Sequence, residues 1–375
     1  GTHPWVLYLL PLAGFVIVSF YKLTETDGLG TDDIIDAVHE GKRLPILLLP
    51  AIFFGTVLTH LCGGSAGREG AALQMGGTIG QCMGRTFRLD DRDLRVATLA
   101  GMAAFFSALF GTPLAATVFA IMVISIGVLY HVALYPSLLA ALVAYGVSVR
   151  LGVEPTRFTV AVPDQSVGMF VRVAALGVLC ALVSILFCKL MHGAGHLMKR
   201  IKNPWLRVIC GGFAVIALTW IFGTDYNGAG MDIVTRAIEQ ETVAVPWAFL
   251  LKLVFTAVTL AAGFKGGEVV PSFFVGATFG CAVSPLLGLP VGFGAAIGLA
   301  AVFCGVTNCP VASTLLAVEL FGAEGMLYFA LACCLSYMLS GYQGLYSSQT
   351  ILYSKLKAQF INVHTNAYHA GEKTE

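Results

Sequence analysis

Apolar runs separated by short polar stretches make up most of this chain. A helix that crosses the hydrocarbon core of a bilayer needs about 20 apolar residues, and most of the runs approach or exceed that length. Two further runs, 71–83 and 269–287, are short and rich in glycine, and broken helices are tolerated at membrane depth only where they line protein or a cavity. The long runs are 5–21, 44–62, 96–129, 135–149, 167–191, 208–222, 247–263, 291–320 and 326–339.

The composition supports a membrane protein. Of the 375 residues, 57% are hydrophobic and 11% are charged, whereas soluble domains average about 25% charged residues. Such a chain has more apolar surface than a soluble core can hide, so we predict an all-α polytopic membrane protein with broken and half-length helices. The net charge of +1 gives no indication of a nucleic-acid partner. The ten cysteines lack disulfide or zinc spacing, and we expect no metal and no cofactor.

Basic residues give a first indication of orientation. They cluster in 85–95 and in 199–202, and loops rich in lysine and arginine face the cytoplasm. We therefore place both segments on the cytoplasmic side, although three aspartates interrupt the first cluster.

The chain contains an internal repeat. Residues 101–121 align without gaps to 298–318, with eight of 21 positions identical, including Pro113 and Pro310. Upstream, residues 73–80 match 273–280, and Glu69 precedes Glu268 by a similar offset of 199 residues. Paired broken helices in two halves predict a transport site at the interface of the repeats. We divide the chain into a first half, 1–165, whose N-terminus we expect to be truncated, and a second half, 166–375.

The segment 63–77 holds the first candidate site residue, Glu69. This carboxylate lies among glycines beside Arg68, and an ionisable group at membrane depth is a functional candidate by default. Glycine lets the backbone approach a ligand closely, and a helix N-terminus offers free N–H groups to an anion. Glu69 is then either a gate that competes with an anion for these N–H groups or a capping carboxylate. Arg68 is an anion ligand or pairs elsewhere.

Three other segments supply further candidates. Glu268, in 263–271, is either a second protonatable group beside the anion path or the partner of Lys265 in a surface ion pair. Residues 28–33 precede an amphipathic stretch, so Thr31 or Asp32 is an N-cap or this is a third helix N-terminus that faces the anion. Tyr346 offers a neutral hydroxyl donor or anchors the chain at the membrane interface; Tyr342 is its competitor.

The order of these motifs resembles the CLC family of chloride channels and proton-coupled anion antiporters. The sequence GREG at 67–70 is followed by a glycine pair, by GGxxxP at 266–271 and by a late GLY at 344–346. The resemblance implies a CLC-like inverted-repeat fold, a homodimer with one pore per subunit and no cytoplasmic regulatory domain. It makes Glu69 the external gate.

The departures from the chloride members point to the bacterial fluoride-exporting branch. Leu29 stands where chloride members carry a serine, Ala71 replaces a proline, and Met122 and Val123 occupy the place of the internal proton-transfer glutamate. The gain of Glu268, with Met75 and Asn308 as candidate pore-lining residues, also resembles that branch.

We therefore expect a proton-coupled fluoride antiporter of the bacterial inner membrane and no enzyme. The alternative is a chloride channel or chloride/proton antiporter of the same fold, and an intramembrane hydrolase with Ser65 as nucleophile is a distant rival. Glu69 and Glu268 would carry protons. The anion site would draw on backbone and side-chain groups of Leu29, Gly30, Gly67, Arg68, Gly70, Gly267, Val269 and Tyr346. The expected partners are fluoride or chloride, protons, the lipid bilayer and a second copy of the chain.

Overall fold

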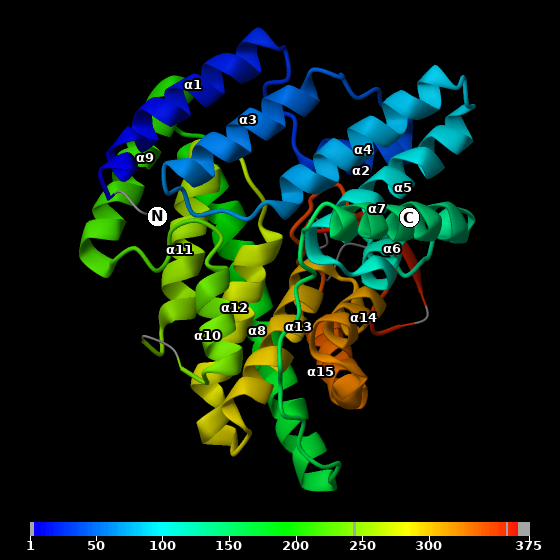
Figure 1. Cartoon of the computed structure of the whole chain (residues 1–375), viewed down its shortest axis with the longest axis vertical. Coiled ribbons are helices and arrows are strands. Elements are labelled where there is room, and N and C mark those ends of the chain that lie inside the picture. Colours follow the sequence, from blue (N-terminus) through cyan, green and yellow to red (C-terminus); the bar gives the residue numbers. More distant parts are fainter. Residues whose placement is uncertain (1–3, 243–244, 358, 367–375) are drawn as a thin grey trace.

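The computed structural model describes residues 4–242, 245–357 and 359–366. These residues form 15 α-helices and three short strands (Figure 1). The helices of the first half are α1 (Leu10–Leu23), α2 (Thr31–Glu40), α3 (Leu48–Leu61), α4 (Glu69–Thr86), α5 (Asp91–Phe110), α6 (Pro113–Met122) and α7 (Leu134–Arg150). Those of the second are α8 (Val167–Met198), α9 (Pro204–Phe222), α10 (Met231–Glu239), α11 (Ala248–Ala262), α12 (Val269–Leu287), α13 (Val291–Thr307), α14 (Pro310–Phe321) and α15 (Met326–Leu339).

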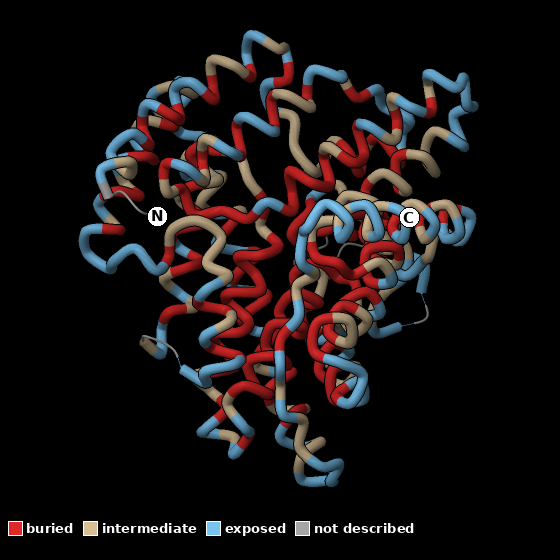
Figure 2. Tube along the Cα trace, in the orientation of Figure 1, coloured by how far each residue is buried: buried red, intermediate tan, exposed pale blue. Residues whose placement is uncertain are grey.

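Six of the described helices are long and apolar enough to cross a membrane: α1 with its preceding 3₁₀ turn, α5, α7 with its preceding turn, α8, α9 and α12. Helix α8 has 32 residues, which corresponds to about 48 Å at the rise of an α-helix, more than the roughly 30 Å of a hydrocarbon core. The buried residues concentrate along the helices at the centre, while the outer helices carry exposed segments (Figure 2). The chain is thus a mostly helical, polytopic membrane protein.

The two halves repeat the same order of helices. In chain order, helices α1–α7 correspond to α9–α15. The short α2 and α10, the long α4 and α12, and the short, proline-initiated α6 and α14 stand at equivalent places. The two long apolar runs of the repeat are split at Thr112–Pro113 and Cys309–Pro310. In each, a residue in the left-handed conformation, Gly111 (φ 71°) or Asn308 (φ 61°), ends one helix, and a proline begins the next, as expected of C-cap and N1 positions.

The glycines in 71–83 and 269–287 do not break their helices, contrary to our expectation. Both segments belong to continuous helices, α4 and α12, of 18 and 19 residues. The glycines instead allow close helix packing, because a Cβ on Gly76 would collide with the carbonyl of Gly101, and one on Gly276 with that of Gly298. Small residues serve the same purpose at helix contacts in membranes generally.

The two halves meet at a symmetric backbone contact. Gly67 and Gly267 form an isolated antiparallel bridge, in which each N–H donates to the other carbonyl at 2.7 Å. Helices α4 and α12 begin two residues beyond this bridge, at Glu69 and Val269. The N-termini of two equivalent helices therefore converge at the centre of the molecule.

A small sheet, which the sequence did not predict, closes one end of the chain. Strand β1 (Ser125–Ile126) pairs in parallel with β2 (Thr350–Tyr353), which pairs antiparallel with β3 (Phe360–His364). Ile126, Ile351 and Ile361 form its buried core. The sheet connects the end of the first repeat to the segment that follows Tyr346.

Candidate functional site

Glu69 lies buried at the point where the two helix N-termini converge. Its side chain is 1% exposed. One carboxylate oxygen, Oε1, accepts a hydrogen bond from the N–H of Arg68 at 3.0 Å, and Oε2 accepts one from the N–H of Val270 at 3.2 Å. The carboxylate thus takes up backbone donors from both halves of the repeat. A small anion would need the same kind of donor at a helix N-terminus.

Glycine is required around this carboxylate. A Cβ at Gly67 would collide with Oε2 of Glu69, and a Cβ at Gly267 would collide with the backbone nitrogen of Gly70. An added Cβ at Gly70 would lie 2.9 Å from Cα of Gly267, closer than real Cβ contacts allow. The three glycines predicted as anion-binding residues therefore form the close backbone approach that holds Glu69.

Glu268 is not the structural equivalent of Glu69, and this corrects the repeat alignment. The bridge pairs Gly67 with Gly267, so Glu268 corresponds to Arg68 and Glu69 to Val269. Consecutive residues at a helix start point in different directions. Arg68 is exposed, while the half-buried Glu268 lines a cavity.

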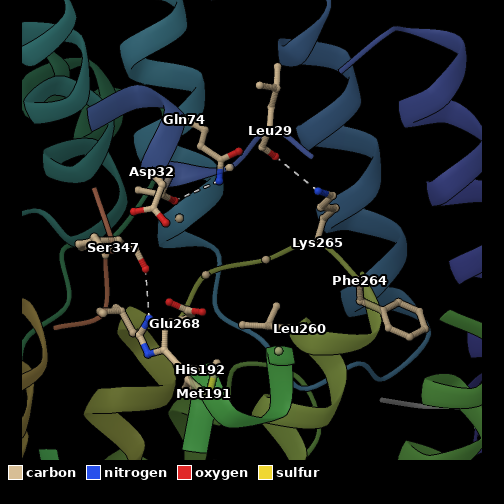
Figure 3. Close-up of a pocket in the computed structure, with 18 of the residues that line it drawn as sticks. Leu29, Asp32, Gln74, Met191, His192, Leu260, Phe264, Lys265, Glu268 and Ser347 are labelled. Atoms are coloured by element: carbon tan, nitrogen blue, oxygen red, sulfur yellow. Dashed lines mark hydrogen bonds between the residues drawn. The ribbon is translucent and has the colours of Figure 1, made fainter. Parts of the chain in front are cut away.

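This cavity has a volume of about 410 Å³. It reaches from Glu268 to the exposed side chains of His196 and Lys199 at the C-terminal end of α8. From the lysines and arginine in 199–202 we predict that this end faces the cytoplasm. The N-terminus of α2, the start of α4 and the segment 345–347 complete the walls, and Figure 3 shows Asp32, Glu268 and His192 around the same open space.

Lys265 lies at the cavity wall but does not pair with Glu268. Among the described residues the only ion pair within 4.0 Å joins Lys42 to Asp33. The ammonium group of Lys265 instead lies 4.1 Å from the centroid of the Tyr21 ring and 3.5 Å from the carbonyl oxygen of Leu29. The alternative of a surface Lys–Glu pair is therefore wrong, and Lys265 holds the loop that carries Leu29 at the cavity.

Helix α2 begins one residue earlier than our cap assignment required. Gly30, rather than Thr31 or Asp32, is the N-cap, and its N–H donates to the carboxylate of Asp33 at 2.9 Å. Gly30, Thr31 and Asp32 all line the cavity with Glu268, so the N-terminus of α2 does face it. Because the N–H of Gly30 already has an acceptor, its role as an anion donor stays a prediction that requires this bond to open; the same holds for the mutually bonded N–H groups of Gly67 and Gly267.

Tyr346 lines the cavity and is 5% exposed. Its carbonyl accepts a hydrogen bond from Thr365 at 2.6 Å, which fixes the backbone, and the part of the chain that the structure describes shows no hydrogen bond to its hydroxyl. The competing Tyr342 donates to or accepts from Ser354 at 2.7 Å and does not line the cavity. The geometry therefore favours Tyr346 as the hydroxyl donor.

The two candidate pore-lining residues lie outside this cavity. Met75 is half-buried on α4 and lines neither of the two cavities described. Asn308 lines a second cavity of about 460 Å³, and its amide donates to the carbonyl of Gln343 at 3.1 Å and to the side chain of Gln349 at 3.2 Å. A cap at the end of α13 accounts for Asn308, since asparagine tolerates the left-handed conformation.

One buried cation near the gate was missed by sequence reasoning. Lys252 on α11 is fully buried and donates to the carbonyls of Tyr226, at 3.1 Å, and Gly228, at 2.6 Å. The N–H of Gly228 in turn donates to Gly64, so the lysine holds a loop against the segment that leads to Glu69. A lone lysine within the apolar run 247–263 is the sequence signal that could have identified it.

Comparisons with known proteins identify the family of this chain. The family model described as voltage gated chloride channel matches residues 11–341. A protein of Pseudomonas syringae pv. tomato named chloride/fluoride channel protein is 40% identical over 366 residues, covering 94% of this chain and 80% of the relative. The voltage-gated ClC-type chloride channel ClcB of Escherichia coli is 23% identical over 353 residues, covering 89% and 83%.

Solved structures show the same architecture. A CLC-type fluoride/proton antiporter matches with a TM-score of 0.89 and 33% identity, covering 92% of this chain and 88% of the other. A slow cyanobacterial Cl⁻/H⁺ antiporter matches with a TM-score of 0.75 and 20% identity, covering 90% and 83%. The second likeness supports the fold alone.

Proposed function

Because the chain belongs to the voltage-gated chloride channel family, we propose that it is a proton-coupled fluoride antiporter that exports fluoride. One observation carries the proposal: the buried carboxylate of Glu69 accepts backbone N–H groups from the starts of both α4 and α12. A negatively charged side chain thereby occupies a site suited to an anion. An anion and this carboxylate compete for the same donors.

Protonation of Glu69 gives the exchange cycle. The ionised carboxylate holds the N–H groups of Arg68 and Val270 and excludes the anion. A proton from the outer solution neutralises the carboxylate, weakens both hydrogen bonds and releases the side chain. The anion then takes the donors and continues outward, while the proton moves inward with the side chain. An inward proton gradient drives fluoride out of the cell.

Glu268 is the second proton carrier in this proposal. It lines the inner cavity within one turn of the same helix start that binds Glu69, so a proton released by Glu69 has a carboxylate to receive it. Its position supplies the inner group that is missing at Met122 and Val123. Tyr346 lines the same cavity, and in this proposal its hydroxyl donates to the anion as it enters.

Fluoride is favoured as substrate by similarity to two proteins and by Leu29, which stands where the chloride members of the family carry a serine. The relative with 40% identity is named for both chloride and fluoride, and the solved structure with 33% identity is a fluoride/proton antiporter. Leu29 places an apolar side chain, in place of a hydroxyl, at the start of α2 in the cavity wall. Fluoride carries a tightly held hydration shell, so its site must supply replacement donors, which here are backbone N–H groups and Tyr346.

Chloride transport by the same fold is the second candidate, because the name of the 40% identical relative includes chloride.

We further propose that the protein works as a homodimer in the bacterial inner membrane and that it is no enzyme. Ser65, the candidate nucleophile, is buried, and its hydroxyl lies 3.0 Å from that of Thr256. A threonine hydroxyl is no base for a serine nucleophile.

Anion efflux from liposomes that hold the purified protein tests the function. Vesicles are loaded with equal fluoride and chloride and diluted into an anion-poor solution, while ion-selective electrodes and a pH probe follow both anions and protons. We expect fluoride efflux coupled to proton uptake and little chloride efflux. Fast chloride efflux with proton uptake identifies a chloride antiporter, and anion efflux without proton movement refutes coupling.

A further inference from the structure

Asp32 and His192 are two of the titratable side chains in the inner cavity that the proposed cycle does not use. Both line the cavity that Glu268 lines. They come from different elements, the second helical residue of α2 and the C-terminal part of α8. Figure 3 shows the carboxylates of Asp32 and Glu268 and the ring of His192 facing the same space.

A backbone N–H group binds one carboxylate oxygen of Asp32 and leaves the other oxygen free to take a proton. The N–H of Ser348 donates to Oδ1 at 3.1 Å, and the described residues provide no hydrogen bond to Oδ2. Helix α2 lies outside the membrane-spanning helices. Burial raises the pKa of Asp32, as does repulsion from Asp36, while the Ser348 N–H and His192 oppose the rise. The carboxyl group of Asp32 therefore holds a proton more readily than that of an exposed aspartate.

His192 has a defined proton-accepting nitrogen. Its Nδ1 lies 2.7 Å from the carbonyl oxygen of Cys188, and a carbonyl only accepts, so Nδ1 carries the hydrogen. Nε2 of the neutral ring is then an acceptor, and it lies 3.3 Å from the hydroxyl of Ser347. The ring can therefore gain a proton at Nε2, on the side where Ser347 lines the cavity.

Several charged groups surround Asp32 and Glu268 at the cavity wall. Asp32 and Glu268 are close enough for their negative charges to interact, and His192 interacts electrostatically with Asp32. Asp33, next to Asp32, is already paired with Lys42 at 2.8 Å, and Lys265 is held by Tyr21 and Leu29. The exposed His196 and Lys199 lie at the mouth.

We propose that Asp32, assisted by His192, takes the proton from Glu268 and delivers it to the cytoplasmic solution. This inference rests on the proposed function, for which it supplies the inner end of the proton route. The O–H bond of protonated Glu268 breaks, and an O–H bond forms on Oδ2 of Asp32. That bond then breaks in turn, and the proton passes to water from the solution. When Nε2 of His192 takes a proton from a hydronium ion of the cytoplasmic solution, an N–H bond forms, an O–H bond of the hydronium breaks and water is left. The positive ring then stabilises ionised Asp32, and no oxidant or other co-reactant is needed.

The test compares Asp32→Asn with a matched variant, Asp36→Asn. Both variants remove one carboxylate from α2, and Asp36 does not line the cavity. Asparagine keeps the acceptor for the Ser348 N–H. Fluoride efflux and proton uptake are measured in liposomes at low and high concentrations of a membrane-impermeant sulfonate buffer. In Asp32→Asn we expect proton-coupled turnover to fall at least about tenfold at low buffer, in line with the loss of a positioned proton-transfer group, and to recover as buffer rises.

Each outcome decides between the alternatives. If Asp32→Asn turns over as fast as wild type and Asp36→Asn at low buffer, the proposal is overturned. It is also overturned if Asp32→Asn is slow and buffer does not rescue it, because a defect that buffer does not relieve is structural. If Asp32→Asn fails to fold, His192→Gln decides: we expect a loss on the order of fivefold from the missing charge interaction, and unchanged turnover overturns the assignment. Absence of coupled proton movement in wild type refutes the antiporter function itself, which is a separate result.

Discussion

Replacing Glu69 by glutamine removes the proposed proton-carrying group at the centre of the molecule and leaves the shape of the side chain nearly unchanged. In the structure the carboxylate accepts two backbone N–H groups, at 3.0 Å from Arg68 and 3.2 Å from Val270. Glutamine has one carbonyl oxygen, so its NH₂ group would oppose one of these two donors. The variant therefore keeps one hydrogen bond and loses the charge that strengthens both.

The magnitude follows from these two bonds. A hydrogen bond to a charged group contributes about 1.5–3 kcal/mol, and one between neutral groups about 0.5–1.5 kcal/mol. Losing one charged bond and weakening the other reduces the stability of the occluded position by about 2.5–4.5 kcal/mol, or roughly 70- to 2,000-fold in occupancy. Because the anion competes for the same donors, the apparent dissociation constant for fluoride should fall by up to the same factor.

Two assays check this expectation. Isothermal titration of the detergent-solubilised protein with fluoride, at constant ionic strength, measures the dissociation constant. Flux measurements in liposomes measure the number of protons moved per fluoride, which we expect to fall to zero in Glu69→Gln. The matched control is Glu324→Gln, which removes an exposed carboxylate and should match wild type in both assays.

Two results would refute the reasoning. Full proton coupling in Glu69→Gln would show that another group carries the proton past this point. An unchanged dissociation constant, together with lost coupling, would show that the carboxylate does not compete with the anion for the N–H donors, and the site would lie elsewhere along the path.

Four further predictions follow from named contacts. Gly67→Ala should displace the gate carboxylate, because the new Cβ collides with it, and we expect proton coupling to fall in flux assays while the protein remains folded by size-exclusion chromatography. Gly76→Ala should lower the stability of the protein by about 1–3 kcal/mol through overpacking, whereas Gly146→Ala, with no atom within 4 Å of the added Cβ, should leave it unchanged or raised; thermal unfolding in detergent compares the two. Glu268→Gln should keep anion binding but slow proton uptake at least about tenfold, and equal proton uptake in the variant and wild type would remove this residue from the route. Lys252→Met should leave two buried carbonyls without a donor, at about 1–3 kcal/mol each, and faster hydrogen exchange in residues 223–230 is the expected readout.

The prolines and the polar segments between apolar runs predicted much of the fold. Pro113 and Pro310 marked the helix breaks because proline fits only the first turn of a helix, and the repeat followed from their shared context. The glycines were harder to interpret, since glycine is found both in broken helices and at close helix contacts. Only the contact with a partner helix distinguishes these uses. The partners, α5 and α13, follow the glycine-bearing helices after a turn whose direction the sequence does not predict.

The sequence predicted several residues of the candidate site, but it did not predict which residues contact one another there. Glu69, Tyr346 and the α2 N-terminus were identified from type and context, because buried charge, hydroxyl donors and helix starts have few other uses at membrane depth. The roles of Lys265 and Asn308 depend on contacts with residues 21, 29, 343 and 349, which lie far away in the sequence. Asp32 was considered as a helix cap and His192 was not singled out, because only the folded chain brings the two to one cavity.

The one-residue offset between Glu69 and Glu268 has a consequence for transport. A symmetric bridge relates Gly67 to Gly267, so inverted repeats place Arg68 and Glu268 at equivalent points on opposite sides of the centre. The chain carries an exposed cation at one point and a cavity-facing carboxylate at the other. Equivalent backbone positions thus carry unlike charges, an exposed cation beside Glu69 and a carboxylate that lines the cavity. In the proposed cycle, this difference gives two halves with similar backbones a direction for proton transfer.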